Sequence, residues 1–469
     1  MDFFDLLTMV GGLALFLYGM DVMGDGLAKT SGGKLEQILE KLTSTPIKAV
    51  LLGAGVTAVI QSSSATTVMV VGFVNSGIMK LSQAVGIIMG ANVGTTITSW
   101  ILSLTGIESE NFFIQLLKPS SFAPILALIG IFMMMLTKDS KKKDIASIML
   151  GFAVLMFGME TMSNAVQPLA EIPEFANFLT MFENPLFGVL AGAVLTAIIQ
   201  SSSASVGILQ ALTVTGAISF ASAIPIIMGQ NIGTCATALI SCIGANKNAK
   251  RTALVHLYFN IIGTIVWLSV FYTLNAIFHF EFIDQTVTPA DIALVHSLFN
   301  VASTALLLPF AKQLGKLATL SIPDKGDEDD MPFIDERFLN TPSFAVEQCK
   351  NMTNKMAELS KKNLFLAMSQ IGNYSQKDDA EITENENKID MYEDVLGTYL
   401  VKLSSKSLTI KDSNEISKIL HAIGDIERIG DHAVNILDVA KEMDEKKLSF
   451  SEKAQEEINI LSEAIKEIV

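Results

Sequence analysis

The residues Gln61-Ser-Ser-Ser64 interrupt an otherwise apolar stretch, Pro46–Met79, and the same motif recurs as Gln200-Ser-Ser-Ser203 inside Pro185–Gly216. Each stretch is too long for one simple membrane helix, which needs about 20 apolar residues. Consecutive polar side chains are unfavourable against lipid, where each unsatisfied group costs several kcal/mol. We therefore predict that each motif forms the tip of a re-entrant hairpin and faces protein, water or a ligand.

The two motifs belong to a longer repeat. The offset of 139 positions between Gln61 and Gln200 also aligns small and polar residues, without a gap, over more than 80 positions. The aligned pairs include Gly12 with Gly151, Gly53 with Gly192, Thr57 with Thr196, Gly90 with Gly229 and Asn92 with Asn231. Chance does not hold one register through so many matches. We infer a duplication, with repeat 1 at about residues 6–137, repeat 2 at about 145–280 and an extra helix at about 291–314.

Composition divides the chain into two parts. Of its 469 residues, 50% are hydrophobic and 17% are charged, whereas a soluble protein carries about 25% charged residues. Residues 321–469 hold 31 of the 48 acidic residues and 18 of the 33 basic ones. We expect a transmembrane domain over residues 1–320, a solvated linker over 321–340 and an acidic helical bundle over 341–469. The helical pattern still continues at Val469, which predicts that the sequence is part of a longer chain.

Apolar stretches and loop charges together predict the topology. Besides the two hairpins, seven stretches have the length of crossing helices: Leu6–Leu27, Leu81–Gly106, Ser120–Thr137, Ile145–Val166, Ser219–Gly244, Thr252–Phe280 and Asp291–Leu314. Three crossings and one hairpin in each repeat invert the second repeat relative to the first. Basic loops such as Lys138–Lys143 and Lys247–Arg251 should stay cytoplasmic. The sequence predicts an all-α, multi-pass protein of the cell inner (plasma) membrane, with its N-terminus outside and its C-terminal domain inside.

A second polar motif follows each hairpin. Gly90-Ala-Asn-Val-Gly-Thr95 and Gly229-Gln-Asn-Ile-Gly-Thr234 stand in the same register. Paired glycine-rich motifs of this kind are typical of broken helices, whose unwound carbonyls and amide oxygens suit a hard cation such as sodium. We therefore predict one broken helix in each repeat.

The hairpin tips have the chemistry of an anion site. The second limb of each hairpin begins just after the serines, so its free N–H groups and positive dipole end point at the tip. No Lys or Arg lies in Ala49–Met79, Leu81–Ile107 or Asn184–Asn246. Co-bound cations are then the obvious source of the positive charge that a doubly charged anion needs inside a membrane. This pattern favours cation-coupled anion symport over a purely electrostatic pore.

Duplicated Gln-Ser-Ser-Ser motifs, each followed by Gly-x-Asn-x-Gly-Thr, resemble the type II sodium/phosphate cotransporter family over roughly residues 6–315. The resemblance implies sodium-coupled symport of inorganic phosphate by alternating access. It implies phosphate contacts from the six motif serines, Ser62, Ser63, Ser64, Ser201, Ser202 and Ser203. It also implies a sodium-binding or shared shell made of Gln61, Thr66, Thr67, Asn92, Thr95, Gln200, Ser205, Asn231 and Thr234. The sequence does not decide which residue serves which ion.

Two further patterns lie in the predicted membrane domain. Asp21 and Glu160 share the 139-residue offset, and an intramembrane carboxylate is a functional candidate by default. We predict a coupling role for the pair, with placement at the membrane interface as the alternative. The stretch from Ala253 to Asn260, with His256, recurs from Ala293 to Asn300. We interpret it as a helix–helix contact made through His and Asn, with gating or dimerisation as the alternative.

The C-terminal part carries two acidic pairs. Glu386 and Asp390, like Glu427 and Asp431, lie four residues apart and therefore share a helix face. They resemble the Glu-x-x-x-Asp signatures of PhoU-type helical bundles, which implies a regulatory domain with a metal site, and about one of the two usual three-helix units is present. Oxygen ligands suit a hard ion, with iron or manganese also open. Acidic residues on a solvated face are the alternative.

Other classes of function are less consistent with these patterns. A membrane-bound phosphate sensor needs one site, whereas duplicated hairpins suit the two gates of alternating access. A symporter of another oxyanion, such as sulfate or arsenate, stays open. The predicted membrane part shows no nucleophile–base pair, paired catalytic carboxylates or metal-binding His cluster, which argues against an enzyme. The expected partners are inorganic phosphate, sodium ions, membrane lipid and, as a candidate, a second copy in a homodimer; no nucleic acid is expected.

Overall fold

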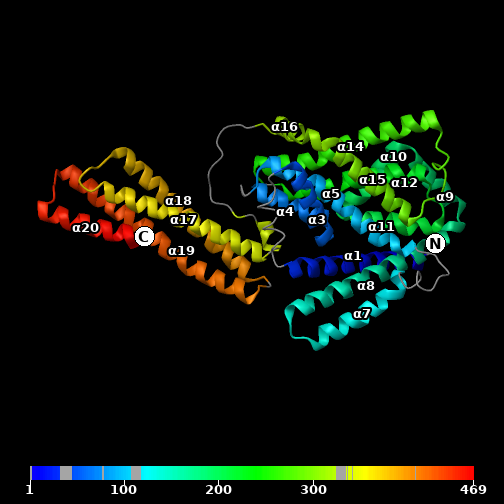
Figure 1. Cartoon of the computed structure of the whole chain (residues 1–469), viewed down its shortest axis with the longest axis horizontal. Coiled ribbons are helices and arrows are strands. Elements are labelled where there is room, and N and C mark those ends of the chain that lie inside the picture. Colours follow the sequence, from blue (N-terminus) through cyan, green and yellow to red (C-terminus); the bar gives the residue numbers. More distant parts are fainter. Residues whose placement is uncertain are drawn as a thin grey trace. The chain divides into compact units, whose positions relative to one another are not determined.

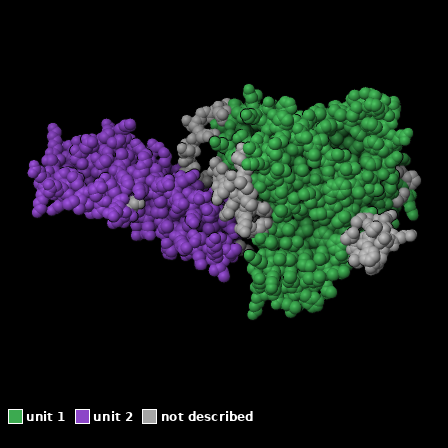
Figure 2. All heavy atoms as spheres, in the orientation of Figure 1, with its two compact units in different colours: residues 1–325 green, residues 326–469 purple. Residues whose placement is uncertain are grey.

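The computed structural model describes residues 3–31, 45–75, 79–106, 118–243, 245–323, 334, 336–340, 342–406 and 408–468. The regular elements of this part are all helices, as predicted. The chain divides into two compact units, residues 1–325 and residues 326–469 (Figure 2). Of the predicted linker, residues 324–333 and 335 lie outside the described residues.

The helices of unit 1 follow the order of the two sequence repeats (Figure 1). The first series is α1 (Phe3–Ser31), α3 (Pro46–Ile60), α4 (Ser63–Asn75), α5 (Leu81–Ser103) with η1 (Leu104–Gly106), and α7 (Pro119–Leu136). The second series is α8 (Ser140–Val166), η2 (Gln167–Glu171), α9 (Pro173–Leu179), η3 (Thr180–Glu183), α10 (Pro185–Ile199), α11 (Ser202–Leu212), η4 (Thr213–Thr215), α12 (Phe220–Gly233), α13 (Cys235–Ser241) and α14 (Lys247–Phe278). The helices α15 (Pro289–Leu307), η5 (Leu308–Phe310) and α16 (Ala311–Ser321) follow.

Six described helical segments are long and apolar enough to cross a membrane. They are Phe3–Leu27, Leu81–Gly106, Ser140–Leu169, Phe220–Ser241, Lys247–Phe278 and Pro289–Ser321, and they coincide with six of the seven predicted crossings. The seventh predicted crossing, Ser120–Thr137, corresponds to α7, an apolar helix of 18 residues. Its described run, Ser121–Leu136, is counted among the shorter apolar helices, so this crossing stays a prediction.

The limbs of the two hairpins are too short to cross a membrane singly. The limbs α3 and α4 have 15 and 13 residues, which at the α-helical rise is about 20 Å each, against an apolar core of about 30 Å. The first limbs begin alike, with Pro46 after the cap Thr45 and Pro185 after the cap Asn184. The segment Asn177–Glu183 meets α10 at a bend of 102°. These dimensions fit hairpins that return to the side from which they entered.

Both hairpins turn on a glutamine with positive φ. Gln61 has φ 60° and ψ 21°, and Gln200 has φ 58° and ψ 22°. A left-handed residue ends an α-helix, but a residue with a side chain pays steric strain in that conformation, so glycine is usual there. A glutamine held in this state at equivalent positions marks the tip as a site where the side chain has a purpose.

The first hairpin limb of each repeat packs against the following long helix through the same glycines. A Cβ added to Gly90 would lie 2.0 Å from the Val50 carbonyl oxygen, and a Cβ added to Gly229 would lie 2.0 Å from that of Val189. Small residues allow helix backbones to approach this closely. Helix α3 therefore packs on α5 as α10 packs on α12.

The first helices of the two repeats pack on each other. A Cβ on Gly12 would lie 3.0 Å from the Gly158 oxygen, and a Cβ on Gly19 would lie 2.6 Å from the Gly151 oxygen. Because the α8 number falls as the α1 number rises, the two helices run antiparallel along their shared face (Figure 1). Phe16 and Met159 are fully buried in the cluster beneath this contact.

Only one of the two predicted helix breaks is present. In repeat 2 the helix ends at Gly233 and resumes at Cys235. In repeat 1, however, α5 is continuous from Leu81 to Ser103 through the whole Gly90–Thr95 motif. The predicted break there is wrong: Gly90 and Gly94 pack against α3 within an unbroken helix.

Unit 2 begins with the short helix η6 (Glu336–Asn340). A bundle of longer helices follows: α17 (Pro342–Ser369), α18 (Gln376–Ser404), α19 (Ile410–Lys446) and α20 (Glu452–Ile468). Ala367 of α17, Ile382 of α18 and Leu437 of α19 meet in its core. The three helices α17–α19 thus form one three-helix unit, while α20 has no buried residue in the described part.

Candidate functional site: the two hairpin tips

The tips of the two hairpins touch. The side-chain oxygens of Ser63 and Ser202 lie 3.4 Å apart, both residues are buried, and each is the repeat equivalent of the other. Beside them, the Ser64 hydroxyl donates to the Gln200 carbonyl oxygen at 3.4 Å. The structure therefore brings serines of both motifs into one place, although 139 residues separate them.

Both tips present the start of a helix. Ser62 Oγ accepts a hydrogen bond from the Ala65 N–H at 3.1 Å, and Ser201 Oγ accepts one from the Ala204 N–H at 3.2 Å. A capping hydroxyl accepts with a lone pair, so its own O–H stays available as a donor. The remaining first-turn N–H groups of α4 and α11 have no acceptor within their helices. Such a pair of helix starts, together with several hydroxyls, can bind an anion without a charged side chain.

In each hairpin, a hydrogen bond between two hydroxyl groups joins the two limbs. Thr57 Oγ1 donates to Thr66 Oγ1 at 3.0 Å, and Thr196 Oγ1 donates to Ser205 Oγ at 2.8 Å. The Thr67 hydroxyl donates to the Ser63 carbonyl at 2.8 Å. Thr66 and Ser205 thus join the two limbs of their hairpins, whereas the Thr67 bond lies within α4. Thr57 and Thr196 were not predicted as site residues, although the repeat register already paired them.

The two motif glutamines lie in different environments. Gln61 is buried; its Oε1 accepts from Thr98 Oγ1 at 3.0 Å, and its Nε2 donates to the Ala58 carbonyl. Gln200 is exposed. Thr237, the repeat equivalent of Thr98, has a buried Oγ1 without a partner among the described residues. Because an unpaired buried hydroxyl costs about 1–3 kcal/mol, this asymmetry of the site is an energetic feature as well as a geometric one.

The Asn and Thr side chains of the two Gly-x-Asn-x-Gly-Thr motifs are buried. They lie in α5, in α12 and in the turn that follows α12. The hydroxyls of Thr95 and Thr234 donate to backbone carbonyls one turn earlier, at 3.1 and 2.9 Å. Asn231 Nδ2 likewise donates to the Ile227 carbonyl, at 2.9 Å. Asn92 differs, because its Nδ2 is buried without a partner among the described residues. No recorded hydrogen bond joins these four side chains to the serines.

Gln230 was missed by the sequence reasoning. It is 1% exposed, and its Nε2 donates to the Ser205 carbonyl at 3.0 Å, which ties α12 to the second hairpin. Its Oε1 is buried without a partner in the described part of the chain. The equivalent residue in repeat 1 is Ala91, so a search for matched polar pairs passes over it.

Helix α14 connects the two asparagine motifs. His256 Nε2 lies 3.4 Å from Asn92 Oδ1, and Asn260 Nδ2 reaches Cys235 Sγ at 3.3 Å. Cys235 in turn contacts the Asn231 carbonyl at 3.8 Å. The second copy of the pattern also contacts α5, because Ser99 Oγ lies 2.8 Å from His296 Nδ1. The repeated His and Asn residues thus make helix contacts, as the sequence suggested.

The two predicted membrane carboxylates, Asp21 on α1 and Glu160 on α8, are both exposed. Their coupling role stays a prediction.

The four acidic residues of unit 2 come near one another. Burial, and then the charges of Asp390, Asp431 and Glu427, raise the pKa of Glu386 to about 7. Both Glu386 oxygens are buried. Even so, in the described part of the chain no three His, Cys, Asp or Glu side chains are grouped closely enough to hold an ion. The metal site at these four residues therefore stays a prediction.

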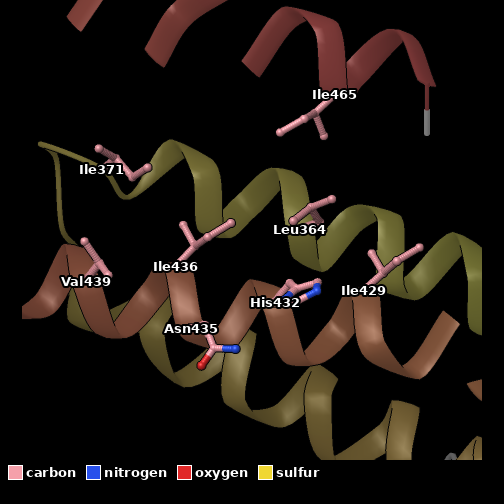
Figure 3. A pocket seen from close by; sticks show the side chains of 8 residues that line it. All are labelled: Leu364, Ile371, Ile429, His432, Asn435, Ile436, Val439 and Ile465. Carbon is pink, nitrogen blue, oxygen red and sulfur yellow. The ribbon is translucent and has the colours of Figure 1, made fainter. Parts of the chain in front are cut away.

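A cavity of about 510 Å³ opens in unit 2 between α17, α19 and α20 (Figure 3). Leu364, Ile429, Ile436 and Ile465 point into it, and the polar side chains at its edge are His432 and Asn435. An oxyanion needs several donors, so this apolar lining does not compete with the hairpin tips as an anion site.

Comparisons with known proteins agree with this geometry. The sequence profile of the Na+/Pi-cotransporter family matches twice, over residues 15–164 and 154–283, once for each repeat. The PhoU domain profile matches residues 353–440, within α17–α19. No solved structure matches the chain.

Several curated proteins are similar to the chain. YqeW of Bacillus subtilis (strain 168), which is uncharacterized, is 32% identical over 323 residues, 68% of this chain and 99% of YqeW. YjbB of Escherichia coli (strain K12), provisionally named an inorganic phosphate export protein, is 24% identical over 436 residues, 91% of this chain and 76% of YjbB. Sodium-dependent phosphate transport protein 2A of Rattus norvegicus is 37% identical over 99 residues, 20% of this chain and 15% of the rat protein. On the twice-matched profile and these relatives, the chain belongs to the Na+/Pi-cotransporter family and is a multi-pass membrane transport protein, not an enzyme, with a C-terminal PhoU domain.

Proposed function

We propose that the protein is a sodium-coupled symporter of inorganic phosphate, and that one phosphate binds where the two hairpin tips meet. The observation that carries the proposal is the 3.4 Å contact between Ser63 and Ser202. It places two helix starts and the hydroxyls of both motifs around one point. Phosphate fits such a site because its oxygens accept from N–H and O–H groups in several directions.

Sodium would supply the positive charge. The two hairpins and the helices that follow them contain no Lys or Arg in Ala49–Met79, Leu81–Ile107 or Asn184–Asn246. A divalent anion there needs compensation, since an isolated buried charge is strongly disfavoured. Buried oxygens near the tips, such as Gln230 Oε1, are free to contact a hard cation. The family and the sodium-dependent rat relative support sodium as that cation.

Alternating access would follow from an inverted relation of the two repeats. Equivalent helices α1 and α8 pack antiparallel through reciprocal glycines, which is the arrangement that a two-fold axis in the membrane plane produces. Such an axis exchanges the two hairpins, so each would gate the site from one side. In this topology the N-terminus lies outside, and the PhoU domain lies in the cytoplasm and regulates transport.

The direction of net transport would depend on the gradients. A symporter moves its substrate in the direction that the combined sodium and phosphate gradients favour. Whether the protein takes up or exports phosphate would therefore depend on these gradients. The name of YjbB points to export of phosphate by that protein. The same tip chemistry would also admit arsenate, which shares the geometry and charge of phosphate.

The test is radiolabelled phosphate flux in proteoliposomes with sodium gradients of either sign. We expect accumulation with an inward sodium gradient, release with an outward one, and competition by arsenate. Correctly inserted protein that moves no phosphate under either gradient, but moves sulfate, would assign another oxyanion. Phosphate binding without flux would instead support the sensor function.

A further inference from the structure

The two hairpins have the same backbone but different side-chain contacts. Gln61 and Gln200 match within 2° in φ, and Thr98 and Thr237 are equivalent in the repeat register. Yet Gln61 is bonded to Thr98, while the Thr237 hydroxyl has no partner in the described part of the chain. The sequence thus has an equivalent glutamine and threonine in each repeat, but the structure forms the hydrogen bond between them only in repeat 1.

The two hairpin tips also differ in how far their equivalent residues are exposed. Gln61 is 6% exposed, whereas Gln200 is exposed. In the first turns that follow, Ala65 is exposed and its equivalent Ala204 is 0% exposed. The hydrogen bond between Ser64 and Gln200 lies at the exposed side of the tips. The tips are therefore more exposed at Ala65 and Gln200 than at Gln61, while Ala204 packs in the hydrophobic cluster that contains Phe16 and Leu102.

We propose that Thr98 and Thr237 are positioning residues that latch the two motif glutamines in turn. In the state seen here the Gln61–Thr98 latch is closed and the Gln200–Thr237 latch is open. In the opposite state Gln200 turns inward to bond Thr237, Gln61 leaves Thr98, and the site opens towards Ala204. This inference rests on the proposed transport function, because it assigns the residues that exchange the two states of that transport.

The exchange is energetically balanced. Each state keeps one Gln–Thr hydrogen bond and leaves one buried threonine hydroxyl unpaired. The number of Gln–Thr hydrogen bonds is therefore the same in both states. The two threonines lie on equivalent helices, α5 and α13, and no charged residue lies in the stretches around them. Two states of similar free energy are what a transporter needs, since both must be populated during a cycle.

The test is thiol labelling of the full-length protein in lipid nanodiscs, which leave both faces open to a water-soluble maleimide. The reporters are the equivalent substitutions Ala65→Cys and Ala204→Cys, each in a separate protein. The native cysteines Cys235, Cys242 and Cys349 are buried, and the parent protein measures their background. We expect the cysteine at position 65 to react much faster than the one at position 204.

Removing one latch should move the two reporters in opposite directions. Thr98→Val should raise the labelling rate at position 204 and lower it at position 65, by about three- to tenfold for one lost hydrogen bond. Thr237→Val should leave position 204 protected even with sodium and phosphate present, and should slow phosphate flux. Thr98→Ser keeps the hydroxyl and should restore the parent rates. Thr161→Val is the matched control, since the Thr161 hydroxyl bonds only its own helix at the Phe157 carbonyl.

The outcomes separate this inference from the transport function. Active phosphate flux with reporters that move together, or no more than in Thr161→Val, overturns the latches and leaves transport standing. Opposite shifts of the reporters in a protein without phosphate flux overturn the transport assignment and retain the latches. If Thr98→Val does not fold, Thr237→Val provides the test. With sodium and phosphate present, labelling of position 204 as fast as in the protein without the Thr237 substitution would contradict the proposal.

Discussion

Ser63 and Ser202 place their side-chain oxygens 3.4 Å apart, from two hairpins that are equivalent in sequence. A contact between a residue and its own repeat equivalent lies on the local symmetry axis. The glycine contacts of α1 and α8 are reciprocal in the same way, Gly12 with Gly158 and Gly19 with Gly151. The anion site that we propose is therefore shared equally by the two repeats.

Gly90→Ala should strongly destabilise unit 1. The added Cβ would lie 2.0 Å from the Val50 carbonyl oxygen, which belongs to backbone and cannot move aside. We expect a loss of at least about 2–3 kcal/mol of folding free energy, seen as a lower melting temperature in detergent. Gly55→Ala is the control, because a Cβ there meets nothing within 4 Å. Equal melting temperatures for the two variants would refute the close packing of α3 on α5.

Gln230→Leu should loosen the second hairpin. The substitution keeps most of the side-chain volume but removes the bond from Nε2 to the Ser205 carbonyl. We expect a loss of about 1 kcal/mol and a higher sodium concentration for half-maximal phosphate flux, because the free Oε1 is lost as well. Ala91→Leu tests the equivalent place in repeat 1, which has no such bond to lose. Unchanged sodium dependence in Gln230→Leu would exclude Gln230 from the cation shell.

The stability of unit 2 should fall as the pH rises towards neutrality. The folded-state pKa of Glu386 is about 7, above its ordinary value of 4.5, chiefly through burial and then the charge of Asp390. A carboxyl group with a raised folded pKa stabilises the fold fully below its unfolded pKa, and this contribution is lost as the pH passes the folded pKa. Allowing for its partial exposure to solvent, we expect about 1–2 kcal/mol between pH 4.5 and 7.5.

Hydrogen exchange in α18 and α19 of the full chain, corrected for intrinsic rates, measures this dependence. Glu386→Gln should remove most of it and raise the protection at pH 7.5. Glu384→Gln is the control, since Glu384 is exposed and pairs with Lys388. A pH dependence that persists in Glu386→Gln would assign it to other groups.

The sequence predicted the symmetric features of the fold well. Matched residues such as Gln61 and Gln200 exposed the duplication, and the polar motifs within short apolar limbs indicated the hairpins. These features follow from local composition and register, which a sequence displays directly. Their contact at Ser63 and Ser202 is consistent with that reasoning but required the tertiary structure.

The features that break the symmetry could not be predicted. The repeat equivalent of Gln230 is the apolar Ala91, and the unequal bonding of Thr98 and Thr237 depends on tertiary contacts. The unbroken α5 could not be predicted either, because the same glycine motif makes the same close contacts in both repeats and the helix is interrupted only in repeat 2.

Equilibrium binding of radiolabelled phosphate to the purified full-length protein tests the shared site most directly. We predict one phosphate per chain in the presence of sodium, with an affinity that Ser63→Ala and Ser202→Ala each reduce by about tenfold and that the double substitution reduces by less than the product of the two. Two independent phosphate sites, or single substitutions that leave the affinity unchanged, would contradict a site built from both hairpin tips.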